Sequence, residues 1–147
     1  MRELRSPGRQ DFERYSPIKR NPPSSIALLA LINAGLLAWI GLLHLGLSIG
    51  VYWAPKAIWV APVELFAAAC LLIAAGAVSM HLQLAREIAW IANGIAFWCV
   101  LLGLFACAIG LASWARITGV DYVAAIAVTV TSTCHLHRWQ NGPGWPL

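Results

Sequence analysis

"SIALLALINAGLLAWIGLLHLGLSIG", residues 25–50, decides the fold of this chain. The run contains no Asp, Glu, Lys or Arg, and it is longer than the roughly 20 residues that a helix needs to cross a bilayer. The rest of the chain has the same character, because its 147 residues are 60% hydrophobic and only 11% charged. In a soluble domain about a quarter of the residues are charged. The sequence therefore predicts an integral membrane protein.

Three further apolar runs follow, and with the first they predict an all-α, antiparallel bundle of four transmembrane helices. The expected spans cover residues 25–50, 59–80, 88–114 and 120–139. Pro62 stands near the start of the second span, where its missing N–H costs little. The fourth span carries Thr and Ser, whose hydroxyls can bond back to helix carbonyls within lipid. Without this span, the chain would have three spans and an external C-terminus.

Basic residues near the span ends predict the orientation of the bundle. One side of the membrane receives Arg2, Arg5, Arg9, Arg14, Lys19, Arg20, Arg86 and Arg138, and the other receives Lys56 and Arg116. We therefore expect both termini in the cytoplasm. Aromatic residues agree with this orientation, because such rings gather at the two membrane interfaces. Tyr52, Trp53, Trp59, Trp114 and Tyr122 fall at the expected outer interface, and Trp90 and Trp139 at the inner one.

The two ends of the chain lie outside the expected spans. Residues 1–24 form a basic cytoplasmic tail whose Pro, Ser, Gly and Arg content predicts disorder, and residues 140–147 form a short C-terminal tail. A cleaved signal peptide has an apolar region of about 7 to 15 residues, so we expect the first span to be retained. The basic tail either attracts anionic lipid headgroups or an acidic partner surface, or serves only as an orientation signal.

His44 and Glu64 are ionisable residues inside two of the expected spans. Each lies roughly 9 Å below the outer end of its span, at 1.5 Å per residue. Two antiparallel helices joined by a short turn are neighbours, so we expect these side chains to form a polar intramembrane pair. Three interpretations are open: a clamp that fixes helix packing, a proton-relay or quinone-headgroup site, or two separate contacts with a partner subunit.

Other polar residues mark the expected inner half of the bundle. Asn33 and Asn93 are candidates for polar contacts between helices. His81, His135 and His137 end spans two and four on the inner side, where they either bind a metal or haem iron or face the lipid headgroups. The sequence contains no phosphate loop, zinc spacing, nucleophile elbow or nucleic-acid motif. We assign no catalytic residue.

The segments "GLLHL" at 41–45 and "PVELFAAACLLIAAG" at 62–76, joined by an aromatic turn that contains proline, resemble the DoxX-like group of small four-helix bacterial membrane proteins. That group is associated with membrane oxidoreductase assemblies and quinone-linked sulfur oxidation. The resemblance implies that His44 and Glu64 carry the function, and that the bundle lies in the inner membrane of a bacterium. The long basic tail and the histidines near the C-terminus depart from the pattern of the group.

Two classes of function fit these observations. The first is a non-catalytic accessory or scaffold subunit of a larger membrane complex, respiratory or redox, or a homo-oligomer. Its partners would be the lipid bilayer and other membrane subunits or further copies of itself, and not nucleic acid. The alternative is a small redox protein that handles protons and binds quinone or haem. A small transporter or channel and a prophage exclusion protein are further alternatives.

Overall fold

The computed structural model describes residues 24–47, 58–109 and 116–141. These residues form helices α1 (Ser24–His44), α2 (Ala61–Ser79), α3 (Ala85–Ala108) and α4 (Arg116–Asn141). Each helix is long and apolar enough to cross a membrane, and no strand occurs in the described ranges. The all-helical prediction is confirmed, and the four helices indicate a multi-pass membrane protein.

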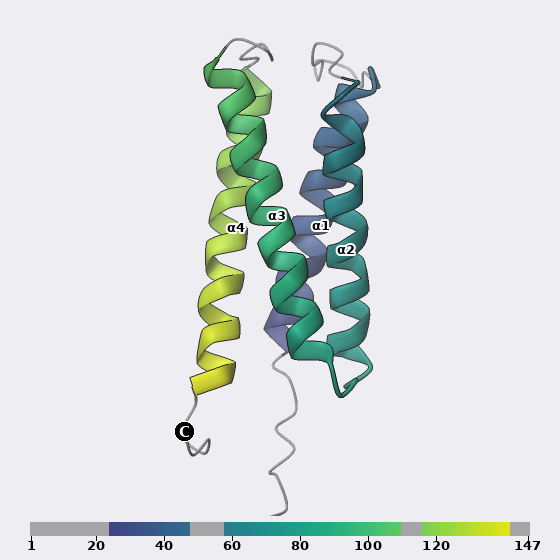
Figure 1. Cartoon of the computed structure of the whole chain (residues 1–147), viewed down its shortest axis with the longest axis vertical. Helices are drawn as coiled ribbons and strands as arrows, with labels where there is room; N and C mark the ends of the chain where they lie inside the picture. Colours follow the sequence, from purple (N-terminus) through teal and green to yellow (C-terminus); the bar gives the residue numbers. More distant parts are fainter. Residues whose placement is uncertain (1–23, 48–57, 110–115, 142–147) are drawn as a thin grey trace, which may run out of the picture.

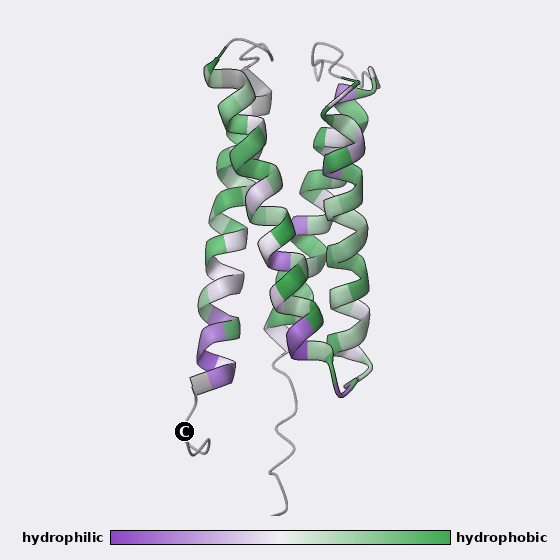
Figure 2. Ribbon diagram, in the orientation of Figure 1, coloured by the Kyte–Doolittle hydropathy of each residue, from purple (hydrophilic) through white to green (hydrophobic). Residues whose placement is uncertain are grey.

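The four helices run alternately up and down and form a closed ring. α1 packs against α2 and α4, and α3 packs against the same two helices. In Figure 1 the start of α1, the turn between α2 and α3, and the end of α4 all lie at the lower end of the bundle. Hydrophilic residues gather at this end on α3 and α4, whereas most of the remaining helix length is apolar (Figure 2). The closed ring places α4 beside α1, although the two helices lie far apart in the sequence.

Small side chains line the interior faces of α2 and α3. The buried alanines are Ala61, Ala67, Ala68, Ala74, Ala75 and Ala77 on α2, and Ala85, Ala89, Ala92 and Ala96 on α3. Small residues let helix backbones approach closely, which favours helix association in lipid. Large apolar side chains, such as Phe66, Ile73 and Trp98, are instead exposed. Helices α2 and α3 therefore present many small residues to the interior and bulky apolar side chains to the outside.

Helix α1 ends at His44. The apolar run predicted an end near residue 50. Gly46 adopts a φ of 95°, and its N–H donates to the Leu43 carbonyl while the N–H of Leu47 donates to the Leu42 carbonyl. These two bonds form a Schellman motif, which closes a helix with one residue in the left-handed region. Glycine enters that region without a Cβ penalty. Hydropathy does not reveal this backbone stop, so the helix is shorter than the apolar run.

Helix α2 ends in the same way, but with a histidine in the left-handed position. His81 has a φ of 53°; its N–H donates to the Val78 carbonyl, and the N–H of Leu82 donates to the Ala77 carbonyl. A residue with a side chain is strained in this conformation, where glycine is usual. His81 is therefore part of the turn that joins α2 to α3.

Helices α3 and α4 begin before the apolar runs that predicted them. Their first residues are Ala85 and Arg116, where we expected spans from about residues 88 and 120. Glu87 lies in the first turn of α3, where the positive end of the helix dipole favours a carboxylate. Helix α3 ends at Ala108. Several residues used in the predictions lie outside the described residues: Tyr52, Trp53, Lys56, Trp114, and residues 1–23 and 142–147 of the two tails.

Candidate functional site

Three buried polar side chains from α1, α2 and α4 meet near one end of the bundle. His44 is the last residue of α1, and Glu64 lies in the first turn of α2. Tyr122 comes from the second turn of α4, and the three residues are 3%, 0% and 1% exposed in the order named. His44 Nδ1 lies 2.7 Å from Glu64 Oε2. The Tyr122 hydroxyl donates to Glu64 Oε1 over 2.5 Å. We refer to these residues as the His–Glu–Tyr cluster.

The backbones around the cluster provide the space for it. A Cβ placed on Gly103 of α3 would lie 2.6 Å from the Tyr122 hydroxyl oxygen, so only glycine leaves room for this ring. A Cβ on Gly41 would lie 3.0 Å from Leu65 Cγ, and α1 and α2 therefore approach closely just below the His44–Glu64 contact. Pro62 begins α2 without the loss of a helical hydrogen bond.

The structure brings His44 and Glu64 together, but nearer the helix ends than the sequence predicted. We expected each residue roughly 9 Å inside its span. Because α1 ends at His44 and α2 begins at Ala61, both residues lie within one turn of a helix end. For His44 the reason is the one given above: Gly46 ends α1 before the apolar run is complete.

The His–Glu–Tyr cluster can hold one proton between an imidazole and a carboxyl group. If Glu64 is a carboxylate, it accepts from His44 Nδ1–H and from the Tyr122 hydroxyl. If Glu64 is a carboxylic acid, it donates to His44 Nδ1 and still accepts from Tyr122. The cluster can therefore store a proton or donate a hydrogen bond to a carbonyl oxygen.

Tyr122 is the member of the cluster that sequence reasoning missed. We placed it in the outer aromatic belt, and this was wrong because its side chain is buried inside the bundle. The spacing of α4 carries a signal that could have found it. Tyr122, Ala125, Thr129 and Leu136 follow one another at steps of three, four and seven, on one helical face, and all four are buried.

A second polar group lies deeper along the bundle and joins α1, α3 and α4. Asn33 Nδ2 donates to Thr129 Oγ1 over 2.9 Å, and Asn93 Nδ2 donates to Thr133 Oγ1 over 2.6 Å and to the Thr129 carbonyl over 3.3 Å. The hydroxyls of Thr129 and Thr133 bond back to carbonyls of their own helix, as predicted for the fourth span. The two asparagines thus meet α4 and not each other. We call these four residues the Asn–Thr layer.

Apolar side chains separate the His–Glu–Tyr cluster from the Asn–Thr layer. Leu37 lies between His44 and Asn33 on α1, and Ala125 lies between the polar residues of α4. Tyr122 and Thr129 are seven residues apart, or roughly 10 Å along the helix. Leu37, Leu71, Ala96 and Ala125 are all buried. Two separate polar levels therefore occupy the described part of the interior.

The histidines at the opposite end have other surroundings. His81 is exposed in the turn after α2, and His137 is exposed near the end of α4. His135 Nδ1 lies 2.9 Å from the Thr131 carbonyl oxygen, to which an N–H at this position donates. Among the described residues, no group of three or more His, Cys, Asp or Glu side chains is placed to hold a metal ion.

Comparison with known proteins found no matching protein-family model, curated protein or solved structure. The two polar levels, and the helices that hold them, are therefore the basis of the functional argument.

Proposed function

We propose that this chain is a non-catalytic accessory or scaffold subunit of a bacterial inner-membrane complex, or a homo-oligomer, with both termini in the cytoplasm. The observation that carries the proposal is the use of the buried polar groups. In the described helices, side chains within the His–Glu–Tyr cluster bond to one another across helices, and so do side chains within the Asn–Thr layer. Such bonds fix which helix faces meet, and this is what a scaffold requires.

The apolar level between the two polar groups also supports a scaffold. A path for protons or ions across the membrane needs polar groups or water at successive depths. Within the described residues, Leu37 and Leu71 occupy the depth between the two polar groups, and both are buried. This arrangement favours packing over conduction, and it makes the transporter or channel alternative the weaker one.

The exterior of the bundle supports contact with lipid or with neighbouring subunits. Trp98, near the middle of α3, is 65% exposed, as is Ile91 on the same helix. Tryptophan is usually enriched at the interfaces of a membrane and not at its centre. An exposed tryptophan at the middle of α3 therefore favours contact with a neighbouring subunit or a bound lipid. The proposed DoxX-like relationship agrees with this function, since it implies a place beside a membrane oxidoreductase.

Purification of the full chain in a mild detergent tests the proposal. We expect a colourless protein without bound quinone, which elutes as a defined oligomer or together with larger membrane subunits. Mass measurement by light scattering or native mass spectrometry gives the assembly state, and absorbance and solvent extraction report haem and quinone. A monomer without partners, or stoichiometric haem or quinone, would contradict the accessory role.

A second candidate function is a small redox protein that handles protons, and the His–Glu–Tyr cluster favours it. Its three side chains form a chain of hydrogen bonds from a phenol through a carboxyl group to an imidazole. Such a chain can exchange a proton and hydrogen-bond a quinone carbonyl. Tyr122→Phe removes one hydroxyl and keeps the ring. If quinone binding is lost while the unfolding transition is retained, the redox function replaces the scaffold.

A further inference from the structure

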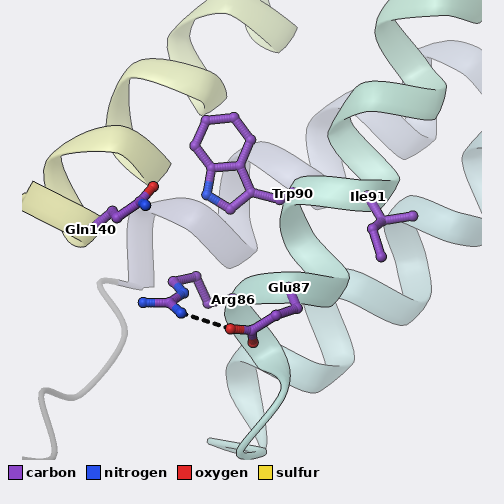
Figure 3. A pocket seen from close by; sticks show the side chains of 5 residues that line it. All are labelled: Arg86, Glu87, Trp90, Ile91 and Gln140. Atoms are coloured by element: carbon purple, nitrogen blue, oxygen red, sulfur yellow. Dashed lines mark hydrogen bonds and ion pairs between the residues drawn. The ribbon is translucent and has the colours of Figure 1, made fainter.

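A shallow depression lies between the first turns of α3 and the last turn of α4, at the end of the bundle where α1 begins. Its volume is about 550 Å³. It is lined by Arg86, Glu87, Trp90, Ile91 and Gln140. Figure 3 shows the Trp90 ring pointing toward α4, with the Arg86–Glu87 pair below it and Gln140 on the opposite wall. We call this feature the interfacial groove.

The chemistry of the interfacial groove changes along the helix axis. Arg86 and Glu87 lie at the helix end, where their side chains are 33% and 46% exposed. Trp90 and Ile91 follow one turn later, roughly 6 Å deeper at 1.5 Å per residue. Ile91 is 65% exposed and can face acyl chains. The groove is thus polar at the helix end and aromatic and aliphatic one turn deeper. A phospholipid changes in the same order, from its polar headgroup to its acyl chains.

The charges of the groove select among headgroups. Arg86 Nη2 donates to Glu87 Oε1 over 2.7 Å, so the rim carries one cation and one anion side by side. A guanidinium has five N–H donors and can hold a carboxylate and a phosphate together. Glu87 and the Gln140 amide oxygen are acceptors. An anionic headgroup would meet repulsion from Glu87, whereas a zwitterionic headgroup finds both of its charges matched.

We propose that the interfacial groove binds phosphatidylethanolamine. Its phosphate lies against Arg86, its primary ammonium donates to Glu87 and to the Gln140 amide, and an acyl chain covers Trp90 and Ile91. A choline headgroup has the same charges but no N–H, so it cannot donate to these acceptors. The ammonium is thus the group that the groove distinguishes. This binding is independent of whether the chain is a scaffold or a redox protein.

Native mass spectrometry of the full chain with added lipid measures this selectivity. We compare phosphatidylethanolamine, phosphatidylcholine and phosphatidylglycerol of identical acyl chains, together with glycerophosphoethanolamine, which has the headgroup and no chains. We expect phosphatidylethanolamine to bind about three- to fivefold more tightly than phosphatidylcholine, as for one exposed charge-assisted contact. Glycerophosphoethanolamine should bind far more weakly, because it lacks the part that meets Trp90 and Ile91.

Three variants assign the selectivity to the groove. Glu87→Gln should abolish the preference over phosphatidylcholine without loss of phosphatidylcholine binding, and Arg86→Gln should weaken the binding of every phospholipid. Gln83→Ala, at an exposed position in the turn before α3, is the matched control and should behave as the unchanged protein. Equal binding of ethanolamine and choline lipids by the unchanged protein overturns the proposal without any variant. Three other results also overturn it. They are tightest binding of phosphatidylglycerol, binding of glycerophosphoethanolamine as tight as that of phosphatidylethanolamine, and a Glu87→Gln protein that keeps the preference for phosphatidylethanolamine.

Discussion

Glu64 is the residue whose replacement should affect the stability of the bundle most. It accepts from Tyr122, lies 2.7 Å from His44 Nδ1 through its Oε2 atom, and is itself 0% exposed. Glu64→Ala removes both contacts and leaves a void among side chains from three helices. A buried polar group that loses its partner costs about 1 to 3 kcal/mol, and removal of one member of a buried pair costs about 3 to 5 kcal/mol. We therefore expect Glu64→Ala to lower the free energy of unfolding by about 3 to 5 kcal/mol.

Glu64→Gln separates the shape of the side chain from its acidity. The glutamine amide oxygen can accept from the Tyr122 hydroxyl, and its amide nitrogen can donate to a neutral His44 Nδ1. Both hydrogen bonds persist, but neither is charge-assisted, and charge-assisted bonds are about twice as strong as neutral ones. We expect this variant to lose about 1 kcal/mol, well below the loss in Glu64→Ala.

Unfolding of the purified protein in mixed detergent micelles, followed by far-ultraviolet circular dichroism, measures these differences. Phe66→Ala is the matched control, because Phe66 lies two residues away on α2 and is 60% exposed; it should change the free energy by less than about 0.5 kcal/mol. The reasoning fails if Glu64→Ala is as mild as this control. It also fails if Glu64→Gln is as damaging as Glu64→Ala, because hydrogen-bond geometry would then not be what the cluster contributes.

Three further tests, two of them with a matched control variant, address other parts of the bundle by the same unfolding measurement. Gly103→Ala places a Cβ 2.6 Å from the tyrosine of the cluster and should cost about 1 to 3 kcal/mol, whereas Gly94→Ala meets open space and should gain up to about 1 kcal/mol. Thr129→Val removes the hydroxyl that accepts from the α1 asparagine and should cost about 0.6 to 1.7 kcal/mol, while Thr131→Val, at an exposed site, should be close to neutral. His81→Gly relieves a φ of 53° and should stabilise the protein by up to about 1 kcal/mol.

Each of these tests has a result that contradicts its premise. Equal effects of the two glycine variants would show that the tyrosine ring is not confined by α3. Equal effects of the two threonine variants would remove the energetic role of the Asn–Thr layer. A loss of stability in His81→Gly would mean that the imidazole makes a contact worth more than the backbone strain, and the interpretation of His81 as a turn residue would then be wrong.

The number and type of helices could be predicted from the sequence because they depend on local properties. Apolar runs long enough to cross a bilayer mark each helix, and proline marks the start of α2 at Pro62. The residues at which the helices end could not be predicted from the apolar runs. Gly46 and His81 end α1 and α2 through backbone angles of 95° and 53°, which hydropathy does not encode.

By itself, the sequence determined that His44 and Glu64 would be neighbours, because a short turn makes consecutive antiparallel helices adjacent. Only the tertiary structure placed Tyr122 against Glu64, at a separation of 58 residues, and Asn33 against Thr129, at a separation of 96. Both contacts depend on which helices close the ring and on how each is rotated about its axis. The spacing of the buried residues of α4 indicates which face of that helix turns inward. Which residues of α1 and α2 this face meets depends on the packing of the whole bundle, and the sequence of α4 does not specify it.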